Sequence, residues 1–473
     1  MSEEKLNTNT TTTIARPWFV FLMMNLGWLF MMFVLGANTT AFPFLTKALE
    51  IDSSYVTWMS TAYTLGAAVL APLMGRLGDL VGIKKIFSLG LILFIISVLG
   101  LGSATHFAIV LASRLIQGLS VACVVPSCLA FAGRFFKGGE AAKAYTIFGA
   151  ISTAGNIVGP MAAGVLCAQD GGFRWVYFGG AILNVIVLVV CFVVIPKIPI
   201  IPVKHGKFDL GGCVTLFIAV ASLLILPTIG QQMGWGSPLA ITCIVLFVVF
   251  IIAFITIEKK VNEPFMRLSL FKNKNFSIPA VFSLLINGIV TVFMYLVSYY
   301  VIGGLRLPST ISGTWTTVTM IFMTIGAIPV ARLMTKVNWR ALSFVHVIVY
   351  ALGCVAFALV KINPVVMIFV GGALIGLAGA FNTPLPSASA LAEVTDAERG
   401  VASGTFRLFN DFTGPIMTAI YVPMLSAINV TPEGYPNFAA SFPVVSWLVL
   451  IPAAIGFVLC FFYPKHDPKA DKK

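Results

Sequence analysis

The sequence predicts an all-helical membrane protein with fourteen transmembrane helices. Of its 473 residues 59% are hydrophobic and only 10% are charged, and the mean hydropathy is +0.98. A soluble domain of this length has too much surface to be covered by so few polar groups. Apolar runs of about 20 residues recur along the chain, and each can cross roughly 30 Å of hydrocarbon. Such runs must be helices, because lipid offers no partner to backbone N–H and C=O groups.

The first span follows a polar, threonine-rich segment that ends at Arg16. This segment is not a cleavable signal, so we expect an uncleaved first helix. The remaining spans follow one another at short intervals and are separated by Gly, Pro and charged residues. The predicted spans are 18–42, 54–75, 85–104, 107–131, 144–167, 175–195, 210–229, 237–257, 277–301, 310–333, 341–360, 363–388, 400–428 and 441–463.

The distribution of positive charge predicts that both termini are cytoplasmic. Cytoplasmic loops carry an excess of Lys and Arg, and this rule is independent of hydropathy. With the amino terminus inside, 24 of the 30 Lys and Arg residues lie on the cytoplasmic side. Arg114 and Arg407 lie within spans, and the four external cations are Lys47, Arg174, Arg306 and Lys361. The net charge of +13 is explained by an anionic membrane surface and does not support nucleic-acid binding.

Two interruptions divide the spans into groups of six, two and six. The first is the Pro- and Lys-rich segment 196–207, where no helix can continue. The second is the charged, amphipathic segment 258–276, which we expect to lie along the cytoplasmic interface. The predicted domains are a tail at 1–17, a six-helix bundle at 18–195, a linker with two extra helices at 196–276, a second six-helix bundle at 277–463 and a tail at 464–473.

Cysteine and histidine give no sign of a disulfide framework, a metal site or a cofactor. All eight cysteines fall in predicted spans and are interpreted as small apolar packing residues. The four histidines are far apart and lack the spacing of metal ligands. We therefore expect no metal site and no cofactor.

The segment from Gly75 to Lys85 concentrates charge and glycine between two apolar runs. It has the form G-x-L-x-D-x-x-G-x-K-K and resembles the loop between the second and third helices of the major facilitator superfamily. That resemblance implies a cytoplasmic latch, in which the Asp pairs with cations and releases them when the transporter changes its facing. The alternative is that this segment is an ordinary cytoplasmic loop whose charged side chains are solvated by water. The residues concerned are Gly75, Arg76, Asp79, Gly82, Lys84, Lys85 and Arg134.

Further motifs narrow the resemblance to the fourteen-helix drug:proton antiporter-2 branch of that superfamily. Span four contains R-x-x-Q-G from Arg114 to Gly118, and span five contains Gly155, Gly159 and Pro160 in an antiporter-like pattern. The pattern of span five is echoed in span thirteen, where Gly414 and Pro415 follow an Asn-Asp pair. Glycine allows close helix contact and proline bends a helix, so these Gly-Pro pairs are expected to let the halves rock. Other matches to the branch lie at 173–175, 208–211, 263–264 and 270–273.

The first span departs from the pattern of drug exporters in that branch. Those members usually carry an Asp in a motif like L-D-x-T-x-V-N-x-A-L-P. This chain has Leu35-Gly36-Ala37-Asn38 in the corresponding stretch, which ends at Pro43 and contains no carboxylate. The missing acid weakens the expectation of a cationic drug as substrate.

Three charged residues stand out because they lie away from the ends of predicted spans: Arg114, Arg407 and Asp411. A charge at the bilayer centre costs roughly 2.5–3.5 kcal/mol or more, so each needs a partner or a water-filled cavity. Asp411 lies about 16 Å from the cytoplasmic end of its span and is four residues from Arg407, on the same helix face. It is the first candidate for the proton acceptor, and a permanent ion pair with Arg407 is the alternative. Family resemblance implies proton transfer for Arg114, which could instead hold its helix through backbone carbonyls.

Two arginines against one Asp leave a net positive interior, which favours an organic anion. A large apolar pocket with a few fixed polar groups would suit an amphipathic ligand. Packing or interfacial placement is the alternative for each aromatic residue. The candidate substrate-binding residues are Asn25, Trp28, Asn38, Arg114, Gln117, Asn287, Tyr295, Asn382 and Arg407.

Together these features predict a proton-coupled secondary active transporter in a prokaryotic plasma membrane, working by alternating access. We expect a small amphipathic substrate, with an organic anion such as a bile acid favoured over the alternative of drug:proton antiport. The predicted partners are this substrate, protons and membrane lipids, with the protein monomeric. An enzyme would need a nucleophile or an acid–base cluster, and a single buried His346 does not supply one. A receptor would need a signalling domain, and the tails are short.

Overall fold

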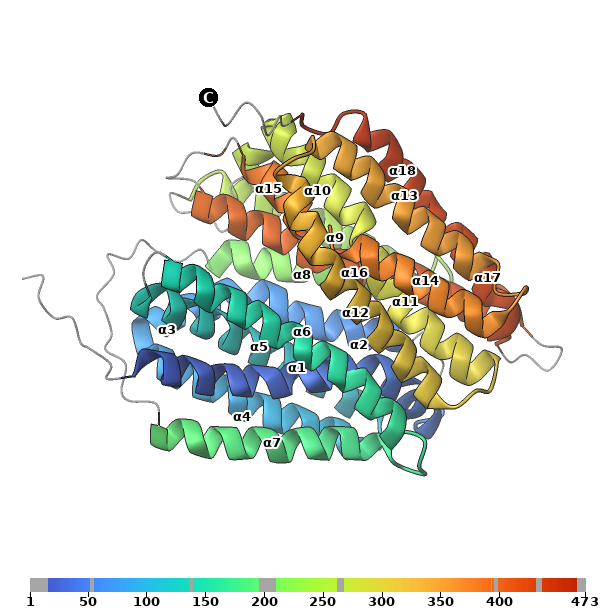
Figure 1. Cartoon of the computed structure of the whole chain (residues 1–473), viewed down its shortest axis with the longest axis horizontal. Helices are drawn as coiled ribbons and strands as arrows, with labels where there is room; N and C mark the ends of the chain where they lie inside the picture. The colour runs from blue at the N-terminus through green and yellow to red at the C-terminus, as the bar shows by residue number, and fades with distance from the viewer. Residues whose placement is uncertain are drawn as a thin grey trace, which may run out of the picture.

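The computed structural model describes residues 16–51, 55–136, 139–194, 210–261, 268–392, 394, 399–430 and 436–465. Within these ranges the regular secondary structure is helical, apart from one isolated antiparallel bridge between Val430 and Pro436. Two bundles of helices lie side by side, one coloured blue to green and the other yellow to red (Figure 1). Each predicted span overlaps a helix or a pair of helices.

The first bundle is built from residues 17–194. Its second span is interrupted by a π-helical turn, and most of the others are continuous. The elements are α1 (Pro17–Ala48), α2 (Tyr55–Thr64), the π-turn η1 (Leu65–Val69), α3 (Leu70–Val81), α4 (Ile83–Gly102), α5 (Phe107–Phe135), α6 (Gly139–Leu166) and α7 (Phe173–Val194).

The second bundle is built from residues 274–460, and three of its predicted spans consist of two shorter helices each. The elements are α10 (Lys274–Ile286), α11 (Gly288–Tyr299), the π-turn η3 (Tyr300–Gly304), α12 (Ser309–Met334), α13 (Trp339–Ala358), α14 (Pro364–Gly379), α15 (Pro384–Leu391), α16 (Arg399–Ala427), α17 (Phe438–Leu448) and α18 (Leu450–Cys460).

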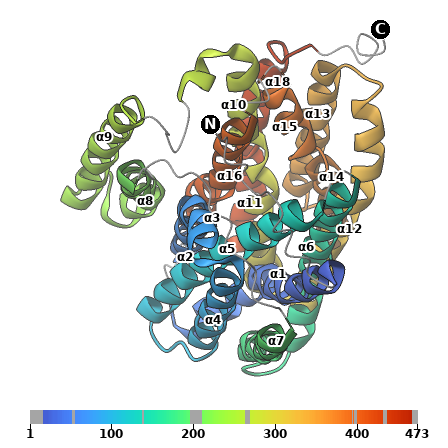
Figure 2. The same ribbon diagram turned by 90° about the vertical axis from the view of Figure 1, so that its left-hand side faces the viewer.

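Between the bundles in sequence lie α8 (Leu210–Met233), α9 (Pro238–Glu258) and the 3-10 turn η2 (Leu268–Lys272). The helices α8 and α9 stand as a hairpin to one side of the molecule (Figure 2). An apolar cluster joins this hairpin to both bundles. It contains Leu65 of η1, Leu216 and Val220 of α8, Phe254 of α9 and Phe412 of α16.

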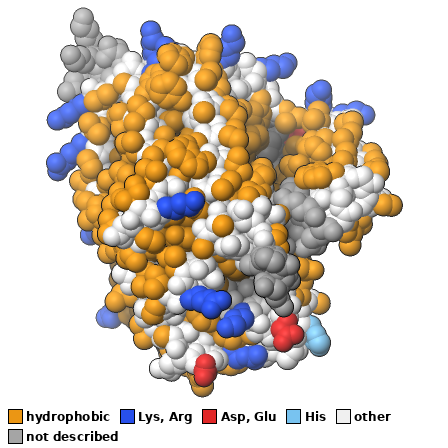
Figure 3. Space-filling view, turned by 90° about the vertical axis from the view of Figure 1, so that its right-hand side faces the viewer, with side chains coloured by type: hydrophobic (Ala, Val, Ile, Leu, Met, Phe, Trp, Pro, Cys, Tyr) orange, Lys and Arg blue, Asp and Glu red, His pale blue; other side chains and the backbone are white. Residues whose placement is uncertain are grey.

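The exterior of the protein is unusually apolar. Large side chains such as Val193 and Ile362 are 83% and 72% exposed. Seen from one end, hydrophobic side chains dominate the surface and scattered Lys and Arg side chains interrupt it (Figure 3). Within the described residues, eleven helices are long and apolar enough to cross a membrane when 274–304, 364–391 and 438–460 are taken as continuous. Water does not favour such a surface, whereas a lipid bilayer does.

The charged loop predicted between spans two and three is shorter than expected. Helix α3 continues to Val81, and α4 begins at Ile83, so Gly82 alone connects them. Its φ of 109° lies in the region that favours glycine, which lets the chain reverse in one residue. Gly75, Arg76 and Asp79 are therefore helical, and Lys84 and Lys85 lie in the first turn of α4.

The first span of each bundle packs closely on the glycine-containing helix that carries the echoed motif. In the first bundle, a side chain at Gly155 or Gly159 of α6 would meet the backbone of α1 at Leu29 or Phe33. In the second bundle, Gly414 of α16 lies against Thr291 of α11. The two Gly-Pro segments thus occupy matching places in the two bundles.

The two bundles are fastened to each other along α6 and α12. A side chain at Gly313 of α12 would meet the backbone of Pro160 and Gly164 in α6. The Ser309 hydroxyl donates to the Gly164 carbonyl at 2.9 Å, and the Thr317 hydroxyl donates to the Ile157 carbonyl at 3.0 Å. Contact between backbones fixes the spacing of the bundles on this side.

Candidate substrate-binding cavity

A cavity of about 440 Å³ lies between the two bundles, and both contribute to its lining. In the first bundle the lining comes from α1, α2, α5 and α6. In the second it comes from the α10–α11 and α14–α15 segments, α12 and α16. The lining residues are Met32, Leu35, Ser60, Tyr63, Thr64, Arg114, Asn156, Asn287, Val290, Thr291, Tyr295, Met323, Asn382, Thr383, Asn410, Thr413, Gly414 and Thr418.

Arg114 is the one charged side chain in this lining among the residues whose side chains the structure describes. Its side chain is only 3% exposed. Its Nε donates to the backbone carbonyl of Met59 at 3.1 Å, and its Nη1 donates to the side-chain oxygen of Gln117. The guanidinium carbon lies 4.6 Å from the ring centroid of Tyr63 and 5.2 Å from that of Phe42. These contacts orient a cation without neutralising it.

The glycine of the R-x-x-Q-G motif explains how Arg114 reaches Met59. Gly118 lies one turn after Arg114, where α5 crosses α2 and η1. A Cβ at Gly118 would collide with the backbone oxygen of Tyr63, and a Cβ at Gly66 would collide with the backbone of α5. Two glycines therefore allow backbone-to-backbone contact, which brings the Met59 carbonyl and the Tyr63 ring to the guanidinium.

In the second bundle, two asparagines lie at breaks in their helices. Asn287 separates α10 from α11, and Asn382 lies between α14 and α15. Their side chains exchange hydrogen bonds with each other's backbone: Asn287 Nδ2 donates to Asn382 O at 2.7 Å, and Asn382 Nδ2 donates to Asn287 O at 3.4 Å. Pro386 has no N–H for the carbonyl four residues earlier, so Asn382 O needs another donor. The side chain of Asn287 supplies this donor, so the Asn382 carbonyl is hydrogen-bonded although the helix is broken.

Further polar groups extend this pair into a buried cluster. Asn287 Nδ2 also lies 2.6 Å from Asn410 Oδ1 and 2.7 Å from Ser283 Oγ. On the other side, Tyr350 OH donates to Asn382 Oδ1 at 2.9 Å, and His346 Nε2 lies 3.1 Å from the same oxygen. Because Asn382 Oδ1 can only accept, His346 carries its proton on Nε2. The cluster thus runs from α13 to the cavity.

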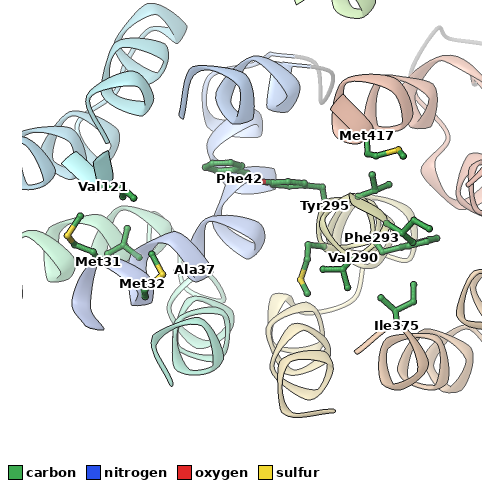
Figure 4. Packing of buried hydrophobic residues seen from close by; sticks show 14 of the residues in the cluster. Met31, Met32, Ala37, Phe42, Val121, Val290, Phe293, Tyr295, Ile375 and Met417 are labelled. Atoms are coloured by element: carbon green, nitrogen blue, oxygen red, sulfur yellow. The ribbon is translucent and has the colours of Figure 1, made fainter. Parts of the chain in front are cut away.

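Tyr295 lines the cavity, and its ring packs on Phe42 of the first bundle. Their rings are stacked with centroids 6.0 Å apart, and Figure 4 shows them facing each other from α1 and α11. The Ser60 hydroxyl donates to Tyr295 OH at 3.3 Å. Further along, Thr46 Oγ1 and Tyr299 OH are 3.2 Å apart. Beyond them a second hollow of about 1290 Å³ is lined partly by Lys47, Glu50 and Arg306.

Four predicted substrate-binding residues do not contribute to the cavity lining in this structure. Asn25 is buried in α1 and donates to Phe21 O at 2.8 Å. Trp28 donates to Ser152 Oγ at 2.5 Å and stacks on Phe148. Asn38 is buried, and the side-chain oxygen of Gln117 accepts a hydrogen bond from Arg114. By contrast, Arg114, Asn287, Tyr295 and Asn382 do line the cavity.

The side chains of several predicted residues lie outside the described part of the chain. This applies to Arg407, Asp411 and Pro415 in α16 and to Arg76 and Asp79 in α3. Asp411 lies in the helix whose Asn410, Thr413, Gly414 and Thr418 line the cavity. Lys84 Nζ donates to Phe192 O in α7 at 3.1 Å, and Arg134 lies in the last turn of α5. The latch therefore remains a prediction.

Sequence reasoning missed two asparagines of the cavity, Asn156 and Asn410. Asn156 Nδ2 donates to Ser152 O at 3.0 Å, and Asn410 Oδ1 accepts from Ser283 Oγ at 2.9 Å. Both stand in the echoed segments, beside the Gly-Pro pairs. The available signal was that Asn156 aligns with Asp411 when the two Gly-Pro pairs are superposed, and Asn410 is the neighbour of Asp411.

Comparison with known proteins identifies the family to which this chain belongs. The sequence profile of the Major Facilitator Superfamily matches residues 24–210 and 210–418. The chain belongs to the major facilitator superfamily. It is therefore a multi-pass membrane transporter of a small molecule, and members of this family and fold are not enzymes.

Several named relatives share low sequence identity with this chain, and their names refer to different substrates. The chain is 26% identical to the multidrug transporter protein MdtP of Bacillus subtilis over 76% of its length and 66% of the relative's, slightly under two thirds. It is 23% identical to the riboflavin transporter RibZ of Clostridioides difficile over 97% of its length and 100% of the relative's. It is 26% identical to the quinolone resistance protein NorB of Staphylococcus aureus, with 88% of each chain covered.

Solved structures agree on the fold. The nucleoside transporter NupG superposes with a TM-score of 0.67 at 15% identity, covering 94% of this chain and 100% of that one. A bacterial homologue of the human lysosomal transporter Spinster, inward-facing and unoccupied, gives 0.70 at 12% identity, covering 95% and 98%. Likeness at this identity shows the fold alone.

Proposed function

We propose that this protein is a proton-coupled secondary active transporter of a small amphipathic organic anion, such as a bile acid or another carboxylate. The observation that carries the proposal is Arg114, an oriented cation in a cavity whose described lining contains no carboxylate. Apolar side chains such as Met32, Leu35, Val290 and Met323 supply the remaining surface. A carboxylate would pair with the guanidinium while its hydrocarbon part contacts these side chains.

The proposed architecture has fourteen spans in a six-two-six arrangement, with both termini cytoplasmic in a prokaryotic plasma membrane. The charge distribution supports the topology, and the α8–α9 hairpin supports the two extra spans. In alternating access, the bundles would rock about the Gly159–Pro160 and Gly414–Pro415 segments, with the Asp79 latch closing the cytoplasmic side. The protein is proposed to act as a monomer without a cofactor.

Asp411 is the proposed proton acceptor, with Arg407 and Arg114 tuning its charge. Its helix lines the cavity, so a proton bound there would be close to a bound anion. A carboxyl group that exchanges its proton as the cavity changes facing would couple the two flows.

Multidrug efflux by drug:proton antiport is the second candidate. The names of the MdtP and NorB relatives favour it, as does the antiporter-like pattern of α6. The name of the RibZ relative points instead to a non-drug heterocycle. The first-span carboxylate that cationic-drug exporters of this branch usually carry is absent from this sequence.

Proton flux in liposomes loaded with a pH-sensitive dye tests the proposal. Adding an external carboxylate amphiphile should acidify the interior of liposomes that contain the protein. Asp411→Asn should abolish this acidification, because an amide cannot carry the proton, while leaving binding of the carboxylate within about threefold of wild type. Binding is measured on the same purified variant.

Protein-free liposomes provide the control for passive entry of the neutral acid. Internal alkalinisation when lipophilic cations are added, without a response to carboxylates, would reject anion symport and favour drug antiport. Undiminished acidification by the Asp411→Asn variant would remove Asp411 from the mechanism.

A further inference from the structure

A groove on the exterior of the first bundle lies between α4 and α7. Both ribbon views place α7 at the edge of the molecule (Figures 1 and 2). The groove encloses about 390 Å³, and the described residues that line it are all apolar. Ala181 is only 4% exposed, whereas Leu99 and Ile182 are 44% and 57% exposed, so a small residue forms the floor and larger ones form the sides. The lining residues are Ile95, Leu99, Phe178, Ala181, Ile182, Val185 and Ile186.

Arg174 lies at one end of this groove. It precedes Phe178 by four residues and Ile182 by eight, so the three side chains lie along one side of α7. Arg174 Nη1 donates to Gly102 O at the end of α4 at 3.2 Å, which places the guanidinium between the two helices. Among the described residues no carboxylate pairs with Arg174. A cation without a neutralising partner therefore stands where the apolar groove ends.

The groove has the depth of one membrane leaflet. In the proposed topology Arg174 is on the outer side, and the neighbouring Trp175 is 61% exposed, as is typical of an aromatic residue at the membrane–water interface. From Arg174 to Ile186 the helix rises about 18 Å. The hydrocarbon of one leaflet is about 15 Å thick, half of the bilayer core. An acyl chain whose headgroup lies beside Arg174 would thus run along the whole groove.

We propose that this groove binds an anionic phospholipid of the outer leaflet, with its phosphate on Arg174 and an acyl chain between α4 and α7. Apolar surface alone does not select a lipid, because the surrounding hydrocarbon is equally apolar. Selection must come from close packing in the groove and from the charge of the headgroup. After its bond to Gly102 O, Arg174 retains four N–H groups for phosphate oxygens. The bound lipid would fasten α7 to α4, outside the substrate cavity.

Native mass spectrometry of the purified full-length protein tests the site without substrate or a proton gradient. Titration with dioleoylphosphatidylglycerol should show a first lipid that binds more tightly than later ones, and dioleoylphosphatidylcholine should bind more weakly. Arg174→Gln should weaken binding of the first lipid by about fivefold, the contribution of one cation near a membrane surface. Arg306→Gln is the matched control, since it removes an external arginine at the second hollow and should change this affinity by less than about twofold.

Leu99→Trp tests the apolar part of the site and leaves Arg174 unchanged. The added ring would occupy the groove and should weaken binding of the first lipid by about fivefold or more. Ile96→Trp is its control, because Ile96 is 50% exposed on the same helix but does not line the groove.

Equal losses in Arg174→Gln and Arg306→Gln, or in Leu99→Trp and Ile96→Trp, would overturn the proposal. Displacement of the lipid by glycerol 3-phosphate, which has no acyl chain, would also overturn it, because Arg174 would then be an anion site alone. If Arg174→Gln does not fold, the two tryptophan variants decide. These outcomes are independent of proton-coupled anion transport, which has its own dye assay.

Discussion

Replacing Arg114 by Gln will weaken binding of a carboxylate substrate by about 10- to 150-fold. A hydrogen bond to a charged group contributes about 1.5–3 kcal/mol, and Arg114 is the charged side chain in the described cavity lining. Arg114→Lys should recover only part of the affinity. A lysine keeps the charge but cannot bond Met59 O and Gln117 while stacking on Tyr63. Equilibrium binding to the purified variants measures both effects.

Arg174→Gln is the control for this experiment. Arg174 lies in α7 outside the cavity lining, and its Nη1 donates to Gly102 O at 3.2 Å. Its replacement should leave carboxylate affinity within about twofold, since exposed or peripheral charges contribute little. Wild-type carboxylate affinity in Arg114→Gln would contradict the proposed role, and improved binding of lipophilic cations would favour the drug-efflux alternative.

Replacing Gly118 by Val will prevent the first bundle from assembling correctly. The first added atom would fall on the Tyr63 carbonyl and close to the backbone of Gly66 and Ala67, and a backbone cannot rotate away as a side chain can. Overpacking of this kind costs about 3 kcal/mol or more. We expect loss of monodisperse protein on size exclusion in detergent, or a Tm lowered by several degrees in any protein that remains folded.

Gly149→Val provides the comparison, because a Cβ at Gly149 of α6 meets nothing within 4 Å. It introduces the same side chain into a helix and should leave stability nearly unchanged, because valine is slightly more favourable than glycine in a helix. Equal loss of folded protein in both variants would show that β-branching, and not the crossing at Gly118, is responsible.

Both the helical membrane fold and the central position of Arg114 can be predicted from the sequence, because both depend on local hydropathy and charge. Apolar runs and the bias of Lys and Arg towards one side are properties of the local chain, so they can be read without knowing any contact. A charge inside such a run is conspicuous because hydrocarbon cannot solvate it. It must face a partner or a cavity, and Arg114 does both.

Uncharged polar residues are harder to assign from sequence. Asn25 and Asn287 stand in similar apolar surroundings, yet Asn25 bonds within its own helix and Asn287 lines the cavity. The difference depends on which helix face meets the other bundle, a tertiary property. Asn156 and Asn410 were overlooked for the same reason, although their place beside the Gly-Pro pairs marks them.

The hydropathy pattern does not predict the breaks within helices either. The runs that contain Asn287 and Asn382 are predominantly apolar and uncharged, so hydropathy predicts them as continuous spans. Only Pro384 and Pro386 give a local sign of the second break. Conversely, the charged segment around Asp79 was predicted as a loop but belongs to a helix that ends at Val81, since a single glycine completes the turn.

The α8–α9 hairpin has a consequence for the route by which substrate arrives. Its apolar cluster touches η1 of the first bundle and Phe412 of the second, so it covers the line where the two bundles meet on that side. On the opposite side, glycines bring α6 and α12 into backbone contact. A molecule dissolved in the surrounding lipid thus finds neither junction open along these helices. Entry into the cavity through either junction would therefore require the hairpin or the α6–α12 contact to separate.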